Sequence, residues 1–136
     1  MGHMWGELPL EGMWSLSKRT RECQIYHKKI SSSYSCFRIE TEFDFPPTLV
    51  FDYMRECDKR MSWDDGYESL KFVRQYPLST AILNVIVKPQ WPLGGREVLV
   101  LFQGCIHPET GSLYLACVST EHPDFPPDTT GKLVRV

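Results

Sequence analysis

The sequence predicts an α+β fold built on an antiparallel sheet, and three observations support this prediction. Short segments rich in Val, Ile, Leu, Tyr and Phe alternate with polar residues, as in strands that bury one face. One segment changes to helical spacing. The order of segments is strands, one helix, strands, which indicates α+β architecture in a single domain over residues 5–136. We interpret residues 1–4 as a cloning scar.

The helical segment begins at two prolines, Pro46 and Pro47, which suit the first turn of a helix. Beyond them, apolar side chains recur at helical spacing and the charged side chains fall on other positions. The sequence therefore predicts one amphipathic helix over residues 47–60. Its apolar positions are Leu49, Val50, Tyr53, Met54 and Cys57.

Strands are expected on both sides of this helix. Before it we predict a weak strand at residues 12–20, a more polar one at 23–30 and a clearer one at 34–43, which form a meander with one wet face. After the helix the sequence predicts further strands and one extended, proline-rich loop. The strand ranges are 67–76, 80–87, 97–106, 112–120 and 132–136, and the loop covers 121–131.

The stretch that organises this prediction is residues 87–97, which joins the two most apolar strands. Its prolines interrupt any continuous ladder, and its Gly-Gly pair supplies a turn. We expect Trp91 to be an apolar anchor in this connection. Trp91 and Trp63 are both expected to be buried and important for stability. Trp63 has a second interpretation, as the wall of a cavity.

Composition excludes several classes of function. The 136 residues are 42% hydrophobic and 24% charged, and the net charge of −2 gives no argument for nucleic acid or an anionic membrane surface. No apolar run approaches the roughly 20 residues of a membrane span, and we find no secretory signal. The five cysteines lack paired spacing. We therefore expect free thiols, buried at Cys36, Cys105 and Cys117, in a reducing, cytosolic compartment.

The sequence offers no convincing set of catalytic residues, which predicts that the chain is not an enzyme. The four histidines lack metal-binding spacing and no nucleotide-binding or hydrolase motif is present, so we expect neither a metal nor a cofactor. Glu121 and His122 could form an acid–base pair, and Asp64 with Asp65 could bind a cation. Neighbouring prolines and the loop position favour structural or surface roles for both pairs.

Three polar residues on the apolar strands, Asn84, Arg96 and Glu97, need partners that the sequence does not identify. Arg96 and Glu97 are adjacent on a strand, so their side chains point to opposite faces and each needs its own partner. Arg96 either ties the connection to the sheet, which we favour, or lies near a bound polar head group. Asn84 has apolar neighbours and needs a hydrogen-bond partner, which is either backbone or ligand.

Four motifs occur along the chain in a fixed order. They are Trp63-Asp64, Trp91-Pro92 through Arg96-Glu97, Val118-Ser119 followed by His122, and the Gly-Lys-Leu-Val-Arg of residues 131–135. Together they resemble the START domain, the lipid-transfer domain related to the steroidogenic acute regulatory protein. The resemblance spans residues 14–136, and Arg96-Glu97 departs conservatively from the Arg-Asp of the family pattern.

The resemblance implies a helix-grip fold, in which a curved antiparallel sheet wraps around a long C-terminal helix and encloses a lipid cavity. Family members hold one lipid or sterol and carry it between membranes or sense it, without covalent chemistry. We therefore predict lipid or sterol binding, transient membrane contact, no nucleic-acid partner and a cytoplasmic location. Phe102 stands where several relatives place a second arginine, which favours a ligand less polar than a phosphate. The predicted ligand-binding residues are Trp63, Ile82, Asn84, Ile86, Arg96, Val98, Val100 and Phe102.

The chain ends where relatives continue through further strands and the C-terminal helix. The resemblance therefore implies a START-like domain that is incomplete at its C-terminus, as a fragment or an isoform, with an exposed apolar face and an unpaired strand edge. Two other hypotheses remain. The first is an interaction module that forms a homodimer or binds a protein partner without ligand. The second is an enzyme of the wider helix-grip superfamily that uses Glu121-His122 or Asp64 as acid or base.

Overall fold

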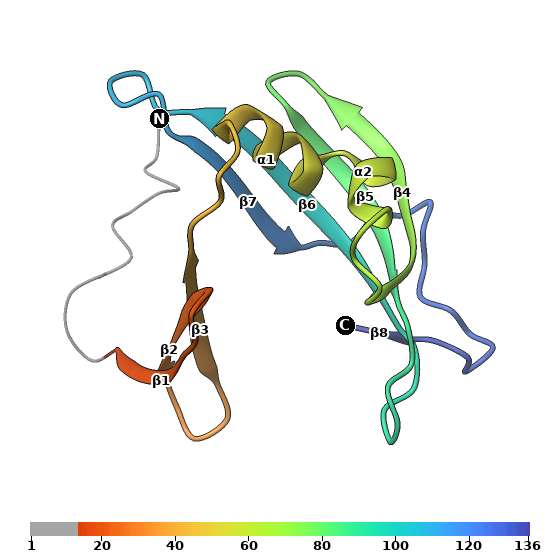
Figure 1. Cartoon of the computed structure of the whole chain (residues 1–136). Coiled ribbons are helices and arrows are strands. Elements are labelled where there is room, and N and C mark those ends of the chain that lie inside the picture. Colours follow the sequence, from red (N-terminus) through yellow and green to blue (C-terminus); the bar gives the residue numbers. More distant parts are fainter. Residues whose placement is uncertain (1–13) are drawn as a thin grey trace. The chain divides into compact units, whose positions relative to one another are not determined.

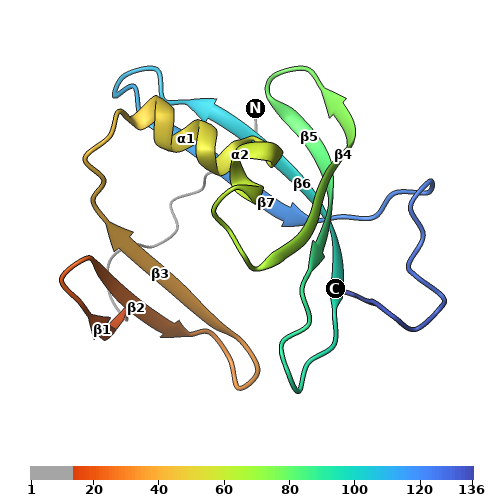
Figure 2. The same cartoon turned by 45° about the vertical axis from the view of Figure 1, so that its right-hand side comes forward.

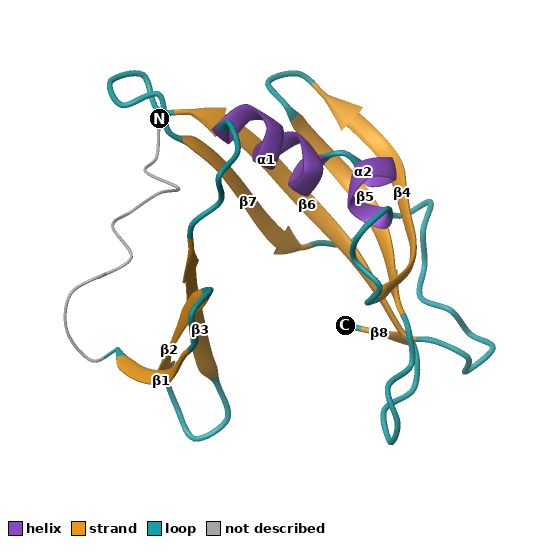
Figure 3. Cartoon of the chain, in the orientation of Figure 1, coloured by secondary structure: helices purple, strands orange, loops and turns teal. Residues whose placement is uncertain are grey.

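The computed structural model of this chain describes residues 14–136 (Figure 1). The interpretation of residues 1–4, like the beginning of the first expected strand, lies outside the described residues. Contacts divide the chain into two compact units, one ending at Asp44 and the other comprising Phe45–Val136. Each unit has its own sheet, and both helices belong to the second unit (Figure 3). The expectation that residues 5–136 form a single domain stays a prediction.

The first unit is the predicted meander. Strands β1 (Ser15–Arg19), β2 (Cys23–Lys29) and β3 (Ser35–Thr41) pair antiparallel in the order β1-β2-β3. The β2–β3 register is regular over its whole length, from Cys23 opposite Thr41 to Lys29 opposite Ser35. Phe37 and Ile39 on β3 are 66% and 65% exposed.

The second unit contains the longer sheet. Strands β4 (Tyr67–Tyr76), β5 (Thr80–Val87), β6 (Arg96–Ile106) and β7 (Leu113–Ser119) follow one another in space as in sequence. The short strand β8 (Val134–Arg135) pairs parallel with the beginning of β6, before the part of β6 that pairs with β7. The predicted strands are confirmed, with the last one shorter than expected.

The predicted single helix is wrong in one respect: it is two helices, α1 (Pro47–Arg55) and α2 (Cys57–Met61). Glu56 between them is extended, with φ −81° and ψ 127°. Its N–H donates to the Asp52 carbonyl at 2.9 Å and its carbonyl accepts the Arg60 N–H at 2.8 Å, so it ends one helix and begins the next. The break lets α1 pack against β7 while α2 packs against β4 (Figure 1). Because residue 56 is neither Pro nor Gly, the local sequence does not signal this break.

The two faces of the longer sheet contact different parts of the chain. Val85 pairs with Val98 on the face that carries α1 and α2, here called the helix face. Asn84 pairs with Leu99 on the opposite face, here called the loop face. Figures 1 and 2 show the chain after β7, residues 120–133, crossing the sheet on this second side.

The core lies where β5 and β6 pair, and residues on both sheet faces contribute to it. Leu99 on the loop face is fully buried. The buried apolar residues are Ala81, Ile82, Val85, Leu99 and Phe102. Gly104 of β6 allows α1 to dock closely, because a Cβ at this position would lie 2.9 Å from the Cζ atom of Phe51.

The two tryptophans expected in the core are not buried. Trp91 is 96% exposed in the turn that Gln90 and Leu93 close with two backbone hydrogen bonds, and Trp63 is 47% exposed. The turn consists of Trp91 and Pro92, so the indole extends from the end of a hairpin, beyond the reach of the sheet. The expectation of a buried apolar anchor at Trp91 was therefore wrong.

All five cysteines are free, and none of the three expected to be buried is fully so: Cys36 and Cys105 are half-buried and Cys117 is exposed. Among the described residues, no helix combines the length and apolar character needed to cross a membrane.

Candidate functional site

A cavity of about 300 Å³ lies between the two helices and the helix face of the sheet. Its size falls at the lower end of the range for small-molecule sites. The strands supply mostly Val, Leu and Phe, together with Tyr67 of β4 and Cys117 of β7, whereas the charged side chains come from the helices. The lining residues are Met54, Arg55, Cys57, Arg60, Tyr67, Leu70, Leu83, Val85, Val87, Val98, Val100, Phe102, Leu115 and Cys117.

The strand alternation explains the apolar wall. Side chains on a strand point alternately to the two faces, so every second residue of β5, β6 and β7 reaches the cavity. Phe102 is 5% exposed, and its ring lies 6.2 Å from that of Phe72 on β4, within the range of aromatic pairs. The wall therefore suits an apolar ligand body.

Arg60 of α2 lines the cavity, and its positive charge is paired with the Asp64 carboxylate. Its Nε and Nη2 atoms lie 2.8 and 2.7 Å from the Asp64 Oδ2 atom, in a pair that is about four-fifths buried. The guanidinium lies 4.5 Å from the centre of the Trp63 ring and 5.4 Å from that of Tyr67, which adds cation–π contacts. Asp64 also accepts the Gly66 N–H at 3.1 Å, so its carboxylate supports the turn after α2 as well as Arg60.

Arg55, the last residue of α1, presents a different polar group to the cavity. Its Nη2 atom donates to Asp52 at 3.2 Å and to Glu56 at 3.3 Å. Its Nε atom is buried and has no hydrogen-bond partner among the described residues. Such atoms are rare because an unpaired buried donor is costly.

Two thiols complete the wall, one from α2 and one from β7. Burial raises the pKa of the Cys57 thiol, and the neighbouring Asp58 carboxylate raises it further. Burial also raises the pKa of Cys117, although the Arg60 charge acts in the opposite direction. Both thiols are therefore uncharged at neutral pH, and the cavity wall carries no thiolate.

The structure brings together only part of the predicted ligand-binding set. Val98, Val100 and Phe102 line the cavity. The prediction that Ile82, Asn84 and Ile86 share their face is wrong, because these three lie on the loop face.

The error has a simple geometric cause. Val87 pairs with Arg96, so positions that share a face have odd numbers on β5 and even numbers on β6. The prediction assumed even numbers on both strands. The correct β5 residues, such as Leu83, could have been chosen only with the register of this hairpin known.

Trp63 and Arg96 do not line the cavity. The Trp63 indole donates to the Tyr53 carbonyl at 3.1 Å, and the Arg96 side chain is exposed. Whether either residue contacts a ligand stays a prediction.

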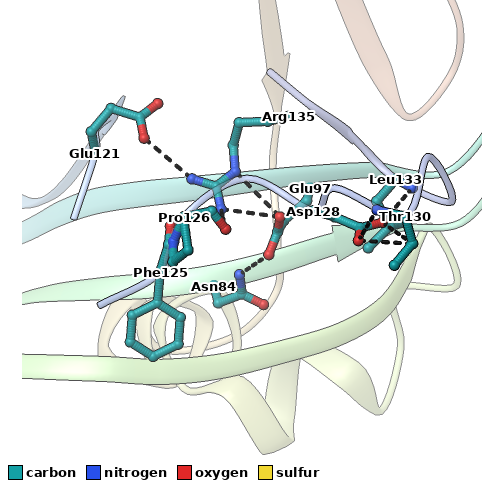
Figure 4. A network of polar contacts seen from close by, with 9 residues as sticks. All are labelled: Asn84, Glu97, Glu121, Phe125, Pro126, Asp128, Thr130, Leu133 and Arg135. Carbon is teal, nitrogen blue, oxygen red and sulfur yellow. Dashed lines mark hydrogen bonds and ion pairs between the residues drawn. The ribbon is translucent and has the colours of Figure 1, made fainter. Parts of the chain in front are cut away.

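Asn84 has its partner on the loop face (Figure 4). Its amide donates to Glu97 Oε1 at 2.6 Å, and the other carboxylate oxygen of Glu97 accepts from Arg135 at 3.0 and 3.3 Å. The Glu97 and Arg135 side chains are only 13% and 8% exposed. Arg135 also donates to the carbonyls of Phe125 and Pro126. The partner of Asn84 is therefore neither backbone nor ligand, but a buried ion pair that ties β8 and the preceding loop to β6.

The acidic and histidine pairs considered for catalysis have structural contacts. Glu121 is 74% exposed and lies 3.3 Å from Arg135, while the His122 ring accepts the Asp124 N–H at 3.2 Å. Within residues 14–136, no three metal-ligating side chains lie together.

Comparison with known families and structures agrees with this geometry. A sequence model of the START domain matches residues 9–136, and the chain therefore belongs to the START domain family. Three solved structures share the fold. Human STARD10 shares 17% sequence identity with this chain, with a TM-score of 0.80. The match covers 90% of this chain and 50% of the STARD10 chain. Human StAR-related lipid transfer protein 5 shares 16% sequence identity with this chain, with a TM-score of 0.80. The match covers 90% of this chain and 59% of the other protein's chain.

The third structure is bacterial. A fragment of the STAR-related lipid transfer protein from Xanthomonas axonopodis is 19% identical with a TM-score of 0.77, over 92% of this chain and 68% of that one. This chain thus spans between half and about two thirds of the length of these structures. Its antiparallel sheet with few helices matches the helix-grip fold of these structures, and no helix follows β8 in the described residues. Comparison with curated protein sequences gave no significant match.

Proposed function

We propose that this chain binds one lipid or sterol in the cavity of the second unit and takes part in moving it between membranes, without catalysis. The observation that carries the proposal is the apolar wall of β5, β6 and β7 beneath two helices in a START domain. Burying hydrocarbon stabilises a complex by about 0.8 kcal/mol per methylene, so a chain of about 14 methylenes gains roughly 11 kcal/mol before ordering costs. The free cysteines support the cytoplasmic location that we also propose.

Native mass spectrometry of the chain after incubation with mixed-lipid vesicles tests this proposal. The V100W variant places an indole in the cavity, because Val100 lines it. V118W is the matched control, since Val118 is 59% exposed and pairs with Leu101 of the loop face. We expect a 1:1 lipid complex that V100W reduces at least about tenfold and V118W leaves unchanged, with circular dichroism confirming that both variants fold. Absence of any bound lipid in the unmodified chain would contradict the proposal.

The exposed end of the β5–β6 hairpin supports transient membrane contact. Trp91 is 96% exposed and Leu93 is 52% exposed, and Trp prefers the interface between water and hydrocarbon. We expect W91S to reduce co-sedimentation with phosphatidylcholine vesicles several-fold. L78S is the control, because Leu78 is 83% exposed in the β4–β5 turn, at the opposite ends of the strands. Equal losses in both variants would indicate nonspecific adhesion instead.

A second candidate function is self-association through a sheet edge. Within the described residues, β7 has β6 as its only neighbour, so its outer side is an open edge of the kind that pairs with another chain. Size-exclusion chromatography with light scattering tests this directly. A dimer that V118K dissociates would support it, whereas a lipid-loaded monomer would contradict it.

A further inference from the structure

We propose that the β2–β3 turn of the first unit docks onto an anionic membrane surface. Ile30 and Tyr34 enter the interface between water and hydrocarbon, and Lys28 and Lys29 bind the negatively charged head groups. This inference goes beyond the proposed function, because the contact lies outside the cavity, belongs to the other unit and requires a negatively charged surface.

The turn that joins β2 to β3 holds two large apolar side chains in solvent. Ile30 is 62% exposed and Tyr34 is 73% exposed. The Ile30 and Ser31 N–H groups donate to the Tyr34 carbonyl at 2.9 and 3.2 Å, so backbone hydrogen bonds close the turn. Residues 30–34 therefore form a short tip beyond the ends of β2 and β3, with the two apolar side chains flanking three serines (Figure 1).

Two lysines lie directly behind this tip. Lys28 and Lys29 are the last residues of β2, and Lys29 is exposed. Neither pairs with a carboxylate among residues 14–136, and the Lys28 ammonium lies 5.9 Å from the centre of the Trp14 ring, a contact that leaves its charge uncompensated. Because neighbouring side chains on a strand point to opposite faces, the two charges flank the hairpin on both sides.

The nearest carboxylates in sequence lie toward the other end of the hairpin. Residues 23–39 contain no aspartate or glutamate. Glu22, Glu40 and Glu42 lie together where β2 begins and β3 ends, and Glu40 is paired with Arg38. The net charge of −2 for the whole chain does not reveal this segregation. The turn therefore carries a local positive potential that attracts an anionic surface.

The order of the side chains favours a membrane over other anionic partners. The apolar residues are outermost, and a cation follows one residue behind, about 3.3 Å along the strand. A bilayer presents matching layers, because its acyl boundary lies beneath the charged head groups and lysine ammonium groups remain at head-group level. Tyrosine is enriched at this interface. An acidic peptide or a nucleic acid would use the lysines but leave Ile30 without apolar surroundings.

Co-sedimentation with phosphatidylcholine vesicles, with and without phosphatidylserine, tests this inference. A lysine near an anionic surface raises affinity about fivefold, and two raise it about 30-fold. We therefore expect phosphatidylserine to increase binding at least about tenfold at low salt, and this gain to shrink as added salt screens the charges. The comparison separates this contact from that of Trp91, which requires no anionic lipid.

A pair of charge variants locates the contact. K28Q/K29Q removes both lysine charges, and we expect it to abolish the gain from phosphatidylserine. K18Q/R21Q is the matched control, because it removes two positive charges from exposed side chains toward the opposite end of the same sheet. We expect this control to keep most of the gain. Equal losses in the two variants would overturn the inference.

A third variant tests the apolar tip. I30S/Y34S keeps both lysines, and we expect it to lower binding to phosphatidylserine vesicles at least about tenfold, with circular dichroism confirming that it folds. Unchanged binding by folded I30S/Y34S would indicate a general polyanion contact and overturn membrane docking. Binding to phosphatidylcholine vesicles without any gain from phosphatidylserine would overturn this inference alone. A gain in a chain that captures no lipid would support it while contradicting the proposed lipid carriage.

Discussion

The ion pair between Glu97 and Arg135 yields the sharpest stability prediction. Both acceptor oxygens of Glu97 are in use, one for Asn84 and one for Arg135. E97Q keeps the shape of the side chain but turns one of these oxygens into a donor, which must then face another donor. Because the two charged side chains are only 13% and 8% exposed, the loss also leaves a buried guanidinium whose remaining carboxylate partner, Glu121, is 74% exposed.

The expected magnitude follows from this burial. Removing one partner of a buried pair costs about 3–5 kcal/mol. With a urea dependence of about 2 kcal/mol per M, the unfolding midpoint of E97Q should fall by about 2 M. The assay is equilibrium urea unfolding followed by circular dichroism, at fixed protein concentration.

E121Q is the matched control, since Glu121 lies 3.3 Å from the same arginine but is 74% exposed. We expect E121Q to cost at most about 1 kcal/mol. Adding R135M completes a double-mutant cycle with E97Q, in which the two losses should be far from additive. A cost of E97Q below about 1 kcal/mol, or additive losses in the cycle, would refute the reasoning that β8 is held by this buried pair.

Three further predictions concern α1, a cavity thiol and the loop before β8. G104A should destabilise the fold by about 1–3 kcal/mol, because its methyl would displace the Phe51 ring, and F51L should recover part of this loss in thermal unfolding. Alkylation of Cys57 should show its rate midpoint at a higher pH than a free cysteine, because burial raises the pKa of this thiol, and bound lipid should slow the reaction. Hydrogen bonds from Thr130 lower the pKa of Asp128, so its stabilising effect is present above the ordinary carboxyl pKa and is lost as pH falls through the lowered value. D128N should therefore be less stable than the unmodified chain at neutral pH, and the difference should vanish in acid; an equal difference at both pH values would contradict this.

Much of the secondary structure could be predicted from the sequence because it depends on local patterns. Short segments of apolar residues, some alternating with polar residues and one almost continuously apolar, indicated most of the strands, and the prolines at positions 46 and 47 marked the beginning of α1. The break at Glu56 could not be predicted. It depends on how α1 and α2 pack against different strands, β7 and β4, which are distant in sequence.

Burial of individual side chains was less predictable. The size of Trp91 suggested a core position, yet its place at the end of a hairpin leaves it exposed. Arg55 attracted no attention in the sequence because charged residues on an amphipathic helix ordinarily face solvent. Its buried Nε atom becomes apparent only when α1 is placed over the sheet.

By itself, the sequence determined the kind of protein: strands with one buried face, a helical segment between them and the motifs of a START domain. Tertiary structure alone decided which strand faces meet. Asn84 and Val85 are neighbours with the same apolar surroundings in sequence, but one joins a buried ion pair and the other lines the cavity. The physical reason is that consecutive side chains on a strand point to opposite faces of the sheet. Which residues share a face depends on the register with β6, and what each face contacts depends on the helices on one side and the loop before β8 on the other.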